Sequence, residues 1–150
     1  MARVVLYSKN GAPIFVVDAA VGPGCPNARP DVLLVQFYLR AIMVDAGSEK
    51  AYQPPGQPPL KIDGTCGAHT NAYIKFFQEE NNRRNPGTNI HVDGRVDPLN
   101  SGTAVSSLTH SPYTIIQLFR TYRTRFLAFS ANPILDPLFP RDLVKPFYIL

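Results

Sequence analysis

The stretch that decides the fold reads Asp63-Gly64-Thr65-Cys66-Gly67-Ala68-His69-Thr70-Asn71-Ala72-Tyr73-Ile74-Lys75-Phe76-Phe77-Gln78. Its Asp-Gly pair is typical of a tight turn, because glycine tolerates positive φ and the Asp side chain bonds nearby backbone. The apolar residues that follow have the spacing of one helix face. A second pair, Asp93-Gly94, repeats the start of this pattern. The pattern predicts a small helical domain punctuated by turns, and it contains no catalytic motif.

A first helix is predicted upstream, over residues 31–44. Its main apolar face carries Val32, Val35, Leu39 and Ile42. Asp31 is a candidate N-cap, and Pro30 is the alternative as the first helical residue. Leu33, Leu34 and Phe37 lie on the other side, so this helix is apolar nearly all round. Its second face must be covered by the N-terminal segment, by the C-terminal segment or by another subunit.

Two further helices follow. The 69–82 helix is expected to bury Tyr73, Ile74 and Phe77, with Thr70 as a candidate cap. Ser111-Pro112 predicts the start of a helix over 113–129. Its apolar stripe consists of Ile115, Phe119, Tyr122, Phe126 and Phe129. We expect Leu39, Ile74 and Phe77 to meet at the centre of a three-helix bundle.

The two ends of the chain differ from this helical pattern. Residues 3–7 and 14–17 are short β-rich runs around Asn10-Gly11, which predicts an N-terminal β-hairpin. Residues 130–150 are apolar but contain prolines that exclude a long helix, which predicts an extended arm. The predicted organisation is a hairpin at 1–22, a mainly α domain at 23–129 and a Pro-rich arm at 130–150.

Composition narrows the class of protein. A hydrophobic content of 45% with nine Phe excludes general disorder. The net charge of +4 is modest and comes with no nucleic-acid-binding motif, so nucleic acid is not an expected partner. No stretch reaches membrane-spanning length, and Val4–Tyr7 is too short for the apolar core of a signal peptide. We therefore expect synthesis in the cytoplasm and no membrane partner.

The residues that commonly carry chemistry are scattered. His69, His91 and His110 are isolated, and no paired Cys-x-x-Cys or nucleophile motif occurs. Cys25 and Cys66 can form a disulfide only if the fold brings them together, and two separate buried thiols are the favoured interpretation. The sequence predicts a protein that is not an enzyme and has no cofactor or metal.

Three segments together resemble a known family. They are Val32-x-x-Val35-Gln36-x-x-Leu39, then Asp63-Gly64-x-Cys66-Gly67-x-x-Thr70-x-x-Tyr73-Ile74-x-x-Phe77-Gln78, then Asp93-Gly94-Arg95-Val96. This arrangement resembles the peptidoglycan-binding-like domain, a three-helix module often attached to cell-wall hydrolases. The resemblance covers residues 31–110. Cys66 stands where the family usually has Phe or Tyr, and Tyr73 replaces a small residue. The last family helix has two candidate positions, 103–108 and 113–129.

The resemblance implies a set of ligand contacts for a peptidoglycan glycan or peptide: Gln36, Asp63, Thr70, Tyr73 and Gln78. Each also has a structural interpretation. The glutamines can bond loop backbone, and the Asp-Gly pairs are turns. The motif is therefore compatible with a shape that binds no ligand, since fold does not imply function.

Two functional hypotheses follow. The favoured one is a non-catalytic structural or attachment subunit of a larger assembly, such as a phage virion, that contacts other protein subunits. Its expected assembly contacts are Leu33, Phe37, Leu138, Phe139, Phe147 and Tyr148. In a virion that matures outside the cell, Cys25 and Cys66 can also bridge neighbouring chains. The alternative is a peptidoglycan-binding module that targets a partner enzyme or particle to the bacterial cell wall.

Overall fold

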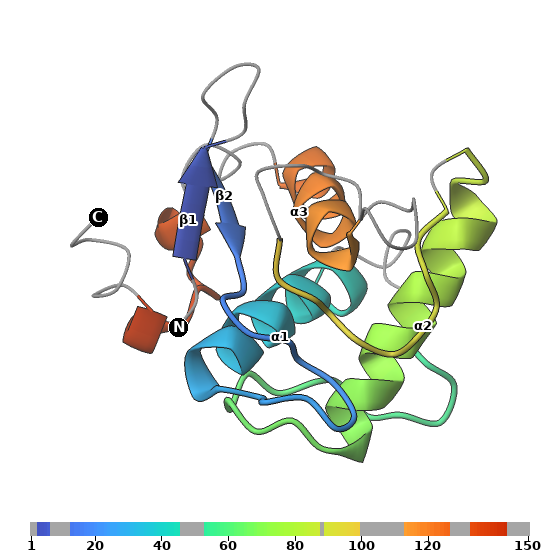
Figure 1. Ribbon diagram of the computed structural model, residues 1–150, viewed down its shortest axis with the longest axis horizontal. Helices are drawn as coiled ribbons and strands as arrows, with labels where there is room; N and C mark the ends of the chain where they lie inside the picture. The colour runs from blue at the N-terminus through green and yellow to red at the C-terminus, as the bar shows by residue number, and fades with distance from the viewer. Residues whose placement is uncertain are drawn as a thin grey trace.

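The computed structural model describes residues 3–6, 13–45, 53–87, 89–99, 113–126 and 133–143. Within them the protein is mainly helical, with helices α1 (Arg29–Met43), α2 (Ala68–Arg84) and α3 (Thr114–Arg125). The short strands β1 (Arg3–Leu6) and β2 (Pro13–Val16) pair in antiparallel orientation, with Arg3 opposite Val16. Figure 1 shows the strands and α2 on opposite sides of α1 and α3. The predicted helical class is confirmed.

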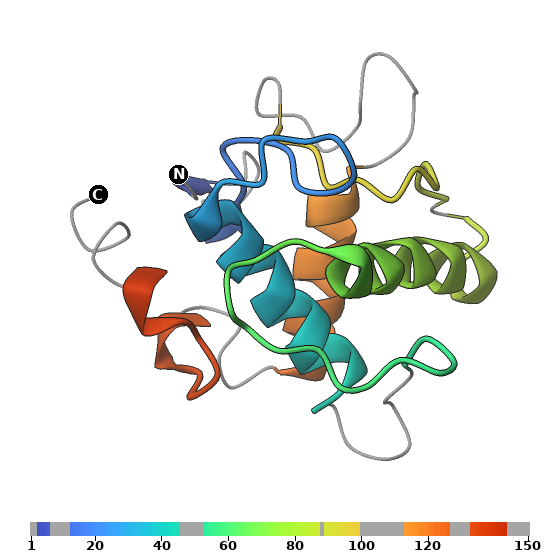
Figure 2. The ribbon, with the colours of Figure 1, turned by 90° about the horizontal axis from the view of Figure 1, so that it is seen from below.

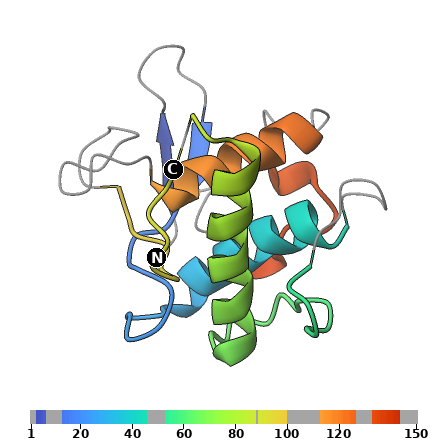
Figure 3. The ribbon, with the colours of Figure 1, turned by 90° about the vertical axis from the view of Figure 1, so that its right-hand side faces the viewer.

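Helix α1 is the centre of the fold, since it contacts α2, α3, β2 and the C-terminal 3-10 turn η3 (Arg141–Leu143). Nearly every residue from Asp31 to Met43 is buried. Figures 2 and 3 show α1 enclosed between the other elements. The N-terminal and C-terminal segments of the chain itself therefore help to cover the second apolar face, as two of the three open alternatives predicted.

Asp31 does not cap α1, contrary to the sequence-based expectation. The helix begins at Arg29 with Pro30 in its first turn, and Ala28 occupies the cap position. The buried Asp31 carboxylate instead accepts backbone N–H bonds from Asp18 at 2.9 Å and Ala19 at 3.2 Å. This carboxylate holds the end of β2 against the start of α1. A short helix-start pattern cannot reveal this role, because the donors lie in a different segment.

The core contains a cluster of aromatic rings around Phe37. Its ring centroid lies 5.2 Å from that of Tyr122 on α3 and 5.1 Å from that of Phe139 in the C-terminal segment. Phe15 on β2 meets Phe139 at 5.9 Å. The Tyr38 hydroxyl donates to the Phe15 carbonyl oxygen at 3.1 Å. The ring of Phe37 thus joins α1 to α3 and to the C-terminal segment.

Helices α2 and α3 agree with their predictions apart from their bounds and their caps, since Tyr113 and not Ser111 precedes the first residue of α3. Leu39, Ile74 and Phe77 are all buried in the hydrophobic core, as predicted, and their meeting at its centre stays a prediction. Thr70 lies inside α2 rather than at its cap, which is Gly67. Along α3 the stripe residues Ile115, Phe119 and Tyr122 are buried and Phe126 is half-buried, while Phe129 falls outside the described residues.

The described part of the C-terminal segment is not an extended arm. It forms the 3-10 turns η2 (Pro133–Leu135) and η3, because prolines interrupt any longer helix while the apolar side chains still find a core. Phe139 and Leu143 are buried, and Leu138 is half-buried. The Tyr122 hydroxyl donates to the buried Asp136 carboxylate at 2.8 Å, which anchors this segment to α3.

These contacts correct part of the expected assembly surface. Leu33, Phe37 and Phe139 belong to the core of the chain itself, so they are not available to another subunit in this fold. Leu138 packs at the edge of the core. Phe147 and Tyr148 lie outside the described residues.

Candidate functional site

A buried amide holds the first Asp-Gly turn. The Gln36 Nε2 on α1 lies within hydrogen-bond distance of the Asp63 carboxylate (3.0 Å), the Thr65 carbonyl oxygen (3.0 Å) and the Thr70 hydroxyl (3.1 Å). Its Oε1 accepts the N–H groups of Asp63 at 3.0 Å and Gly64 at 2.8 Å. We call Gln36, Asp63, Thr65 and Thr70 the first glutamine network. It connects α1, the turn and the first turns of α2.

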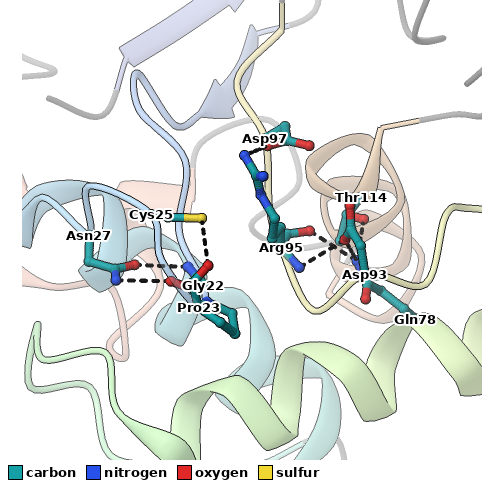
Figure 4. A network of polar contacts seen from close by, with 9 residues as sticks. All are labelled: Gly22, Pro23, Cys25, Asn27, Gln78, Asp93, Arg95, Asp97 and Thr114. Carbon is teal, nitrogen blue, oxygen red and sulfur yellow. Dashed lines mark hydrogen bonds and ion pairs between the residues drawn. The ribbon is translucent and has the colours of Figure 1, made fainter. Parts of the chain in front are cut away.

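The same arrangement recurs one helix later, as Figure 4 shows. The Gln78 Nε2 on α2 lies within hydrogen-bond distance of the Asp93 carboxylate (3.1 Å), the Arg95 carbonyl oxygen (2.9 Å) and the Thr114 hydroxyl (3.0 Å). Its Oε1 accepts the Gly94 N–H at 2.8 Å. Gln78, Asp93, Arg95 and Thr114 form the second glutamine network. It connects α2, the second turn and the start of α3.

Both networks depend on the same backbone geometry. Gly64 has φ of +78° and Gly94 has φ of +74°, values that residues with a side chain rarely adopt. In each turn the Asp carboxylate also accepts the N–H two residues later, at 2.9 Å from both Thr65 and Arg95. The Asp-Gly pairs are therefore turns, as predicted, and the backbone of each turn forms hydrogen bonds with one buried glutamine.

Thr114 is a residue that the sequence analysis missed. It occupies the position in the second glutamine network that Thr70 occupies in the first. Thr70 lies in the helix that directly follows its Asp-Gly turn. A much longer stretch of sequence separates Thr114 from Asp93. The sequence does repeat a glutamine, an Asp-Gly pair and a threonine in the same order. The long separation makes the second threonine, Thr114, hard to recognise as part of the repeat.

The structure gives each of the five expected ligand contacts partners within the chain. Gln36, Thr70 and Gln78 are buried, and their polar groups bond within the chain. The buried Tyr73 donates its hydroxyl to the Pro58 carbonyl oxygen at 2.8 Å. Asp63 alone is exposed. Four of the five side chains therefore hold the fold, and Asp63 is the one that is exposed to solvent.

A recess of about 490 Å³ lies beside the first glutamine network. It is lined by Gln36 and by residues 58–61, 63, 65 and 67–70. Apolar surface comes from Pro59, Leu60 and Ala68, while Lys61 and His69 contribute polar groups. The His69 Nε2 lies 2.8 Å from the Pro58 carbonyl oxygen, so it carries a proton, and Nδ1 is the atom that can bond a ligand. The recess thus combines apolar walls with the Lys61 ammonium and the Asp63 carboxylate.

Asp63 stays ionised over a wide pH range. The Thr65 N–H bond holds its pKa below the usual value, and the Gln36 amide and the Lys61 charge act in the same direction against a smaller effect of burial. Because the pKa of Asp63 is lower in the folded state, its ionised carboxylate stabilises the fold at pH values above the unfolded-state pKa, near 4. This stabilisation is lost as the pH falls through the folded-state pKa.

We expect Asp63→Asn to lower stability at pH 7 by less than about 1 kcal/mol, since solvent screens this exposed carboxylate. Asparagine keeps an oxygen acceptor and loses the charge, so the deficit should shrink between pH 4 and pH 2. Urea unfolding of both proteins across this range measures it. A deficit that grows as the pH falls would contradict the assignment.

The described residues show no group of three or more His, Cys, Asp or Glu side chains placed to hold a metal ion. None of the helices in the described ranges is both long and apolar enough to cross a membrane. Cys25 and Cys66 are both free thiols and both half-buried, rather than fully buried as expected.

No family model, no curated protein and no solved structure matches this chain.

Proposed function

We propose that this protein is a non-catalytic attachment domain that binds bacterial peptidoglycan at the recess. The observation that carries the proposal is the composition of the recess walls, where Lys61, Asp63 and His69 lie beside Pro59 and Leu60. Peptidoglycan presents amides, carboxylates and amines next to methyl groups. A recess with both charges and apolar surface is complementary to that mixture. The resemblance to peptidoglycan-binding-like domains supports the same ligand.

Because the buried glutamines and Tyr73 bond within the chain, substitutions that test ligand binding should be made at other residues. Tyr73→Ala and Gln78→Ala remove buried side chains, so a loss of binding in such variants would report unfolding. Lys61 is exposed, and the ring of His69 contacts Tyr73 at a centroid distance of 5.2 Å. His69→Phe keeps an aromatic ring against Tyr73 while it removes the ring nitrogens.

We expect the Lys61→Ala/His69→Phe variant to bind purified cell-wall sacculi about tenfold more weakly, the change that corresponds to about 1.4 kcal/mol. Co-sedimentation at a series of sacculus concentrations measures the affinity, and circular dichroism verifies the fold. Lys75→Ala is the matched control, because Lys75 is exposed on α2 and does not line the recess. The proposal fails if the wild type does not sediment with sacculi, or if the double variant binds as the wild type does.

A second candidate function is a structural subunit of a larger assembly such as a phage virion. One observation favours it: Leu135 on η2 is 66% exposed, beside the half-buried Ile134 and Leu138. Exposed apolar side chains mark a contact site for another protein when they form a contiguous patch, and Leu135 is the exposed member of this group. It replaces the face of α1 as the candidate contact, since that face is buried within the chain.

Light scattering of the purified protein tests this second function. Self-association that Leu135→Asp abolishes and Lys75→Glu preserves would support it. A wild type that stays monomeric at high concentration and fails to join particles in a co-expression assay would reject it.

A further inference from the structure

The two charged side chains of the recess share one face of the chain. Lys61 and Asp63 are exposed and line the recess, while Ile62 between them packs against the core. This alternation is that of an extended stretch, in which side chains two positions apart point to the same side. The recess therefore presents an ammonium and a carboxylate together on one face.

Hydrogen bonds to α1 hold this stretch in place. Arg40 donates to the Leu60 carbonyl oxygen at 2.9 Å, and Arg29 donates to the Asp63 carbonyl oxygen at 2.7 Å. Gln36 accepts the Asp63 N–H at 3.0 Å. Figure 2 shows this loop, in green, crossing α1 before it reaches the start of α2. The backbone that carries the two charges is thus positioned before any ligand arrives, which lowers the entropic cost of binding.

Both charges keep bonding capacity for a ligand. The bonds that the Asp63 carboxylate accepts from Gln36 and Thr65 both go to Oδ1, so Oδ2 can accept a bond from a ligand. Within the part of the chain that the structure describes, Lys61 forms no ion pair with a carboxylate. Its three N–H donors can therefore bond an anionic group. The recess offers an acceptor for a cation beside a donor for an anion.

The rest of the lining fits a peptide better than a glycan chain. Pro59, Leu60 and Ala68 supply apolar surface for methyl and methylene groups. None of the described residues that line the recess is Tyr, Phe or Trp, the flat side chains on which sugar rings stack. N-acetylated sugar rings are also neutral, so they match neither charge. A volume of about 490 Å³ lies within the range of small-ligand pockets, about 300–1,000 Å³, and suits the end of one peptide.

We propose that the recess recognises an α-amino-acid zwitterion, an ammonium and a carboxylate on one carbon atom, at a free end of a peptidoglycan peptide stem. Asp63 Oδ2 accepts a bond from the ligand ammonium, and the Lys61 ammonium donates to the ligand carboxylate. Charges in complementary order fix the orientation of the ligand and exclude neutral competitors. The assignment rests on the proposed function and narrows its ligand from peptidoglycan as a whole to the peptide stems.

The probe is the stem tripeptide L-alanyl-γ-D-glutamyl-meso-diaminopimelate, whose side-chain end carries such a zwitterion. NMR titration of the full chain measures its affinity and the affinities of two derivatives, one acetylated on the amine of that end and one amidated on its carboxylate. We expect each derivative to bind about tenfold more weakly, because each loses one charge-assisted hydrogen bond. The shifts should be largest in the backbone amides of residues 60–70. Chitotetraose, a neutral sugar chain, should not displace the tripeptide.

Two variants test which side chain binds which charge. Asp63→Asn should bind the free and the acetylated peptides equally, and Lys61→Met should bind the free and the amidated peptides equally. Asp93→Asn is the matched control, because Asp93 is exposed, occupies the same position in the second glutamine network and does not line the recess. Its affinities should equal those of the wild type.

The outcomes distinguish this proposal from the proposed function. If sacculi retain the protein but the tripeptide binds no better than its derivatives, or chitotetraose displaces it, the zwitterion proposal is overturned and the proposed function stands. Variants at Lys61 and Asp63 that keep the wild-type preferences would also overturn it. If the tripeptide binds with the expected preferences and sacculi do not retain the protein, the proposed function alone fails. Binding of neither rejects both.

Discussion

Replacement of Gln78 with alanine is expected to lower the free energy of unfolding by about 3–4 kcal/mol. The side chain is fully buried and bonds to Asp93, Gly94, Arg95 and Thr114. Alanine leaves the Gly94 N–H and the Thr114 hydroxyl without their partner in the protein interior, and each unsatisfied buried group costs about 1–3 kcal/mol. A domain of this size has a total stability of about 5–15 kcal/mol, so this loss is a large fraction.

Urea unfolding followed by circular dichroism measures the effect of Gln78→Ala. Lys75→Ala on the same helix is the control, because it has the same helix propensity change at an exposed position and should stay within about 0.5 kcal/mol of the wild type. Gln36→Ala should resemble Gln78→Ala, since each buried glutamine contacts an Asp carboxylate and accepts the N–H of the following glycine. Two glutamine variants as stable as the control would show that the networks do not hold the turns.

Replacement of Phe37 with alanine is expected to cost about 4 kcal/mol, which lies within the range for buried Phe-to-Ala changes. Phe37 is fully buried, and its ring contacts Tyr38, Tyr122 and Phe139. The variant loses the transfer free energy of the ring and also leaves a cavity that three elements line. Because the C-terminal segment packs against this ring, limited proteolysis after η2 should also accelerate.

Leu135→Ala is the matched control for Phe37→Ala. It also truncates a large apolar side chain, but at a position that is 66% exposed, so it should cost less than about 0.5 kcal/mol. Comparison of the two unfolding curves therefore distinguishes the effect of removing a buried side chain from the effect of removing apolar atoms at an exposed position. Equal stability of the two variants would contradict the placement of Phe37 in the core and would restore α1 as a candidate contact for another subunit.

Much of the fold was predictable, because it is encoded in short spacings. The periodicity around Tyr73, Ile74 and Phe77 identified α2 and its buried face, and glycine identified both turns. The expectation that Gln36 and Gln78 bond loop backbone is confirmed. The boundaries and caps were less accurate, because Asp31 and Thr70 resemble capping residues in isolation.

The candidate site was predictable only in part. The resemblance pointed to Asp63, which lines the recess, but it also pointed to four side chains that the fold uses internally. Lys61 and His69 were not among the expected contacts. A linear motif identifies residues that a family keeps, and it does not separate those that hold a turn from those that face solvent. Only the burial of each side chain makes that distinction.

The sequence by itself determined the helices, the Asp-Gly turns and the residues that each helix buries, because these depend on neighbours within a few positions. The tertiary structure alone decided what covers the second face of α1, where Asp31 finds its donors and that Thr114 completes the second glutamine network. These contacts join residues 13 and 36 positions apart. A local pattern shows that a face or a polar group needs a partner, but which distant segment supplies it depends on how all the elements pack at once.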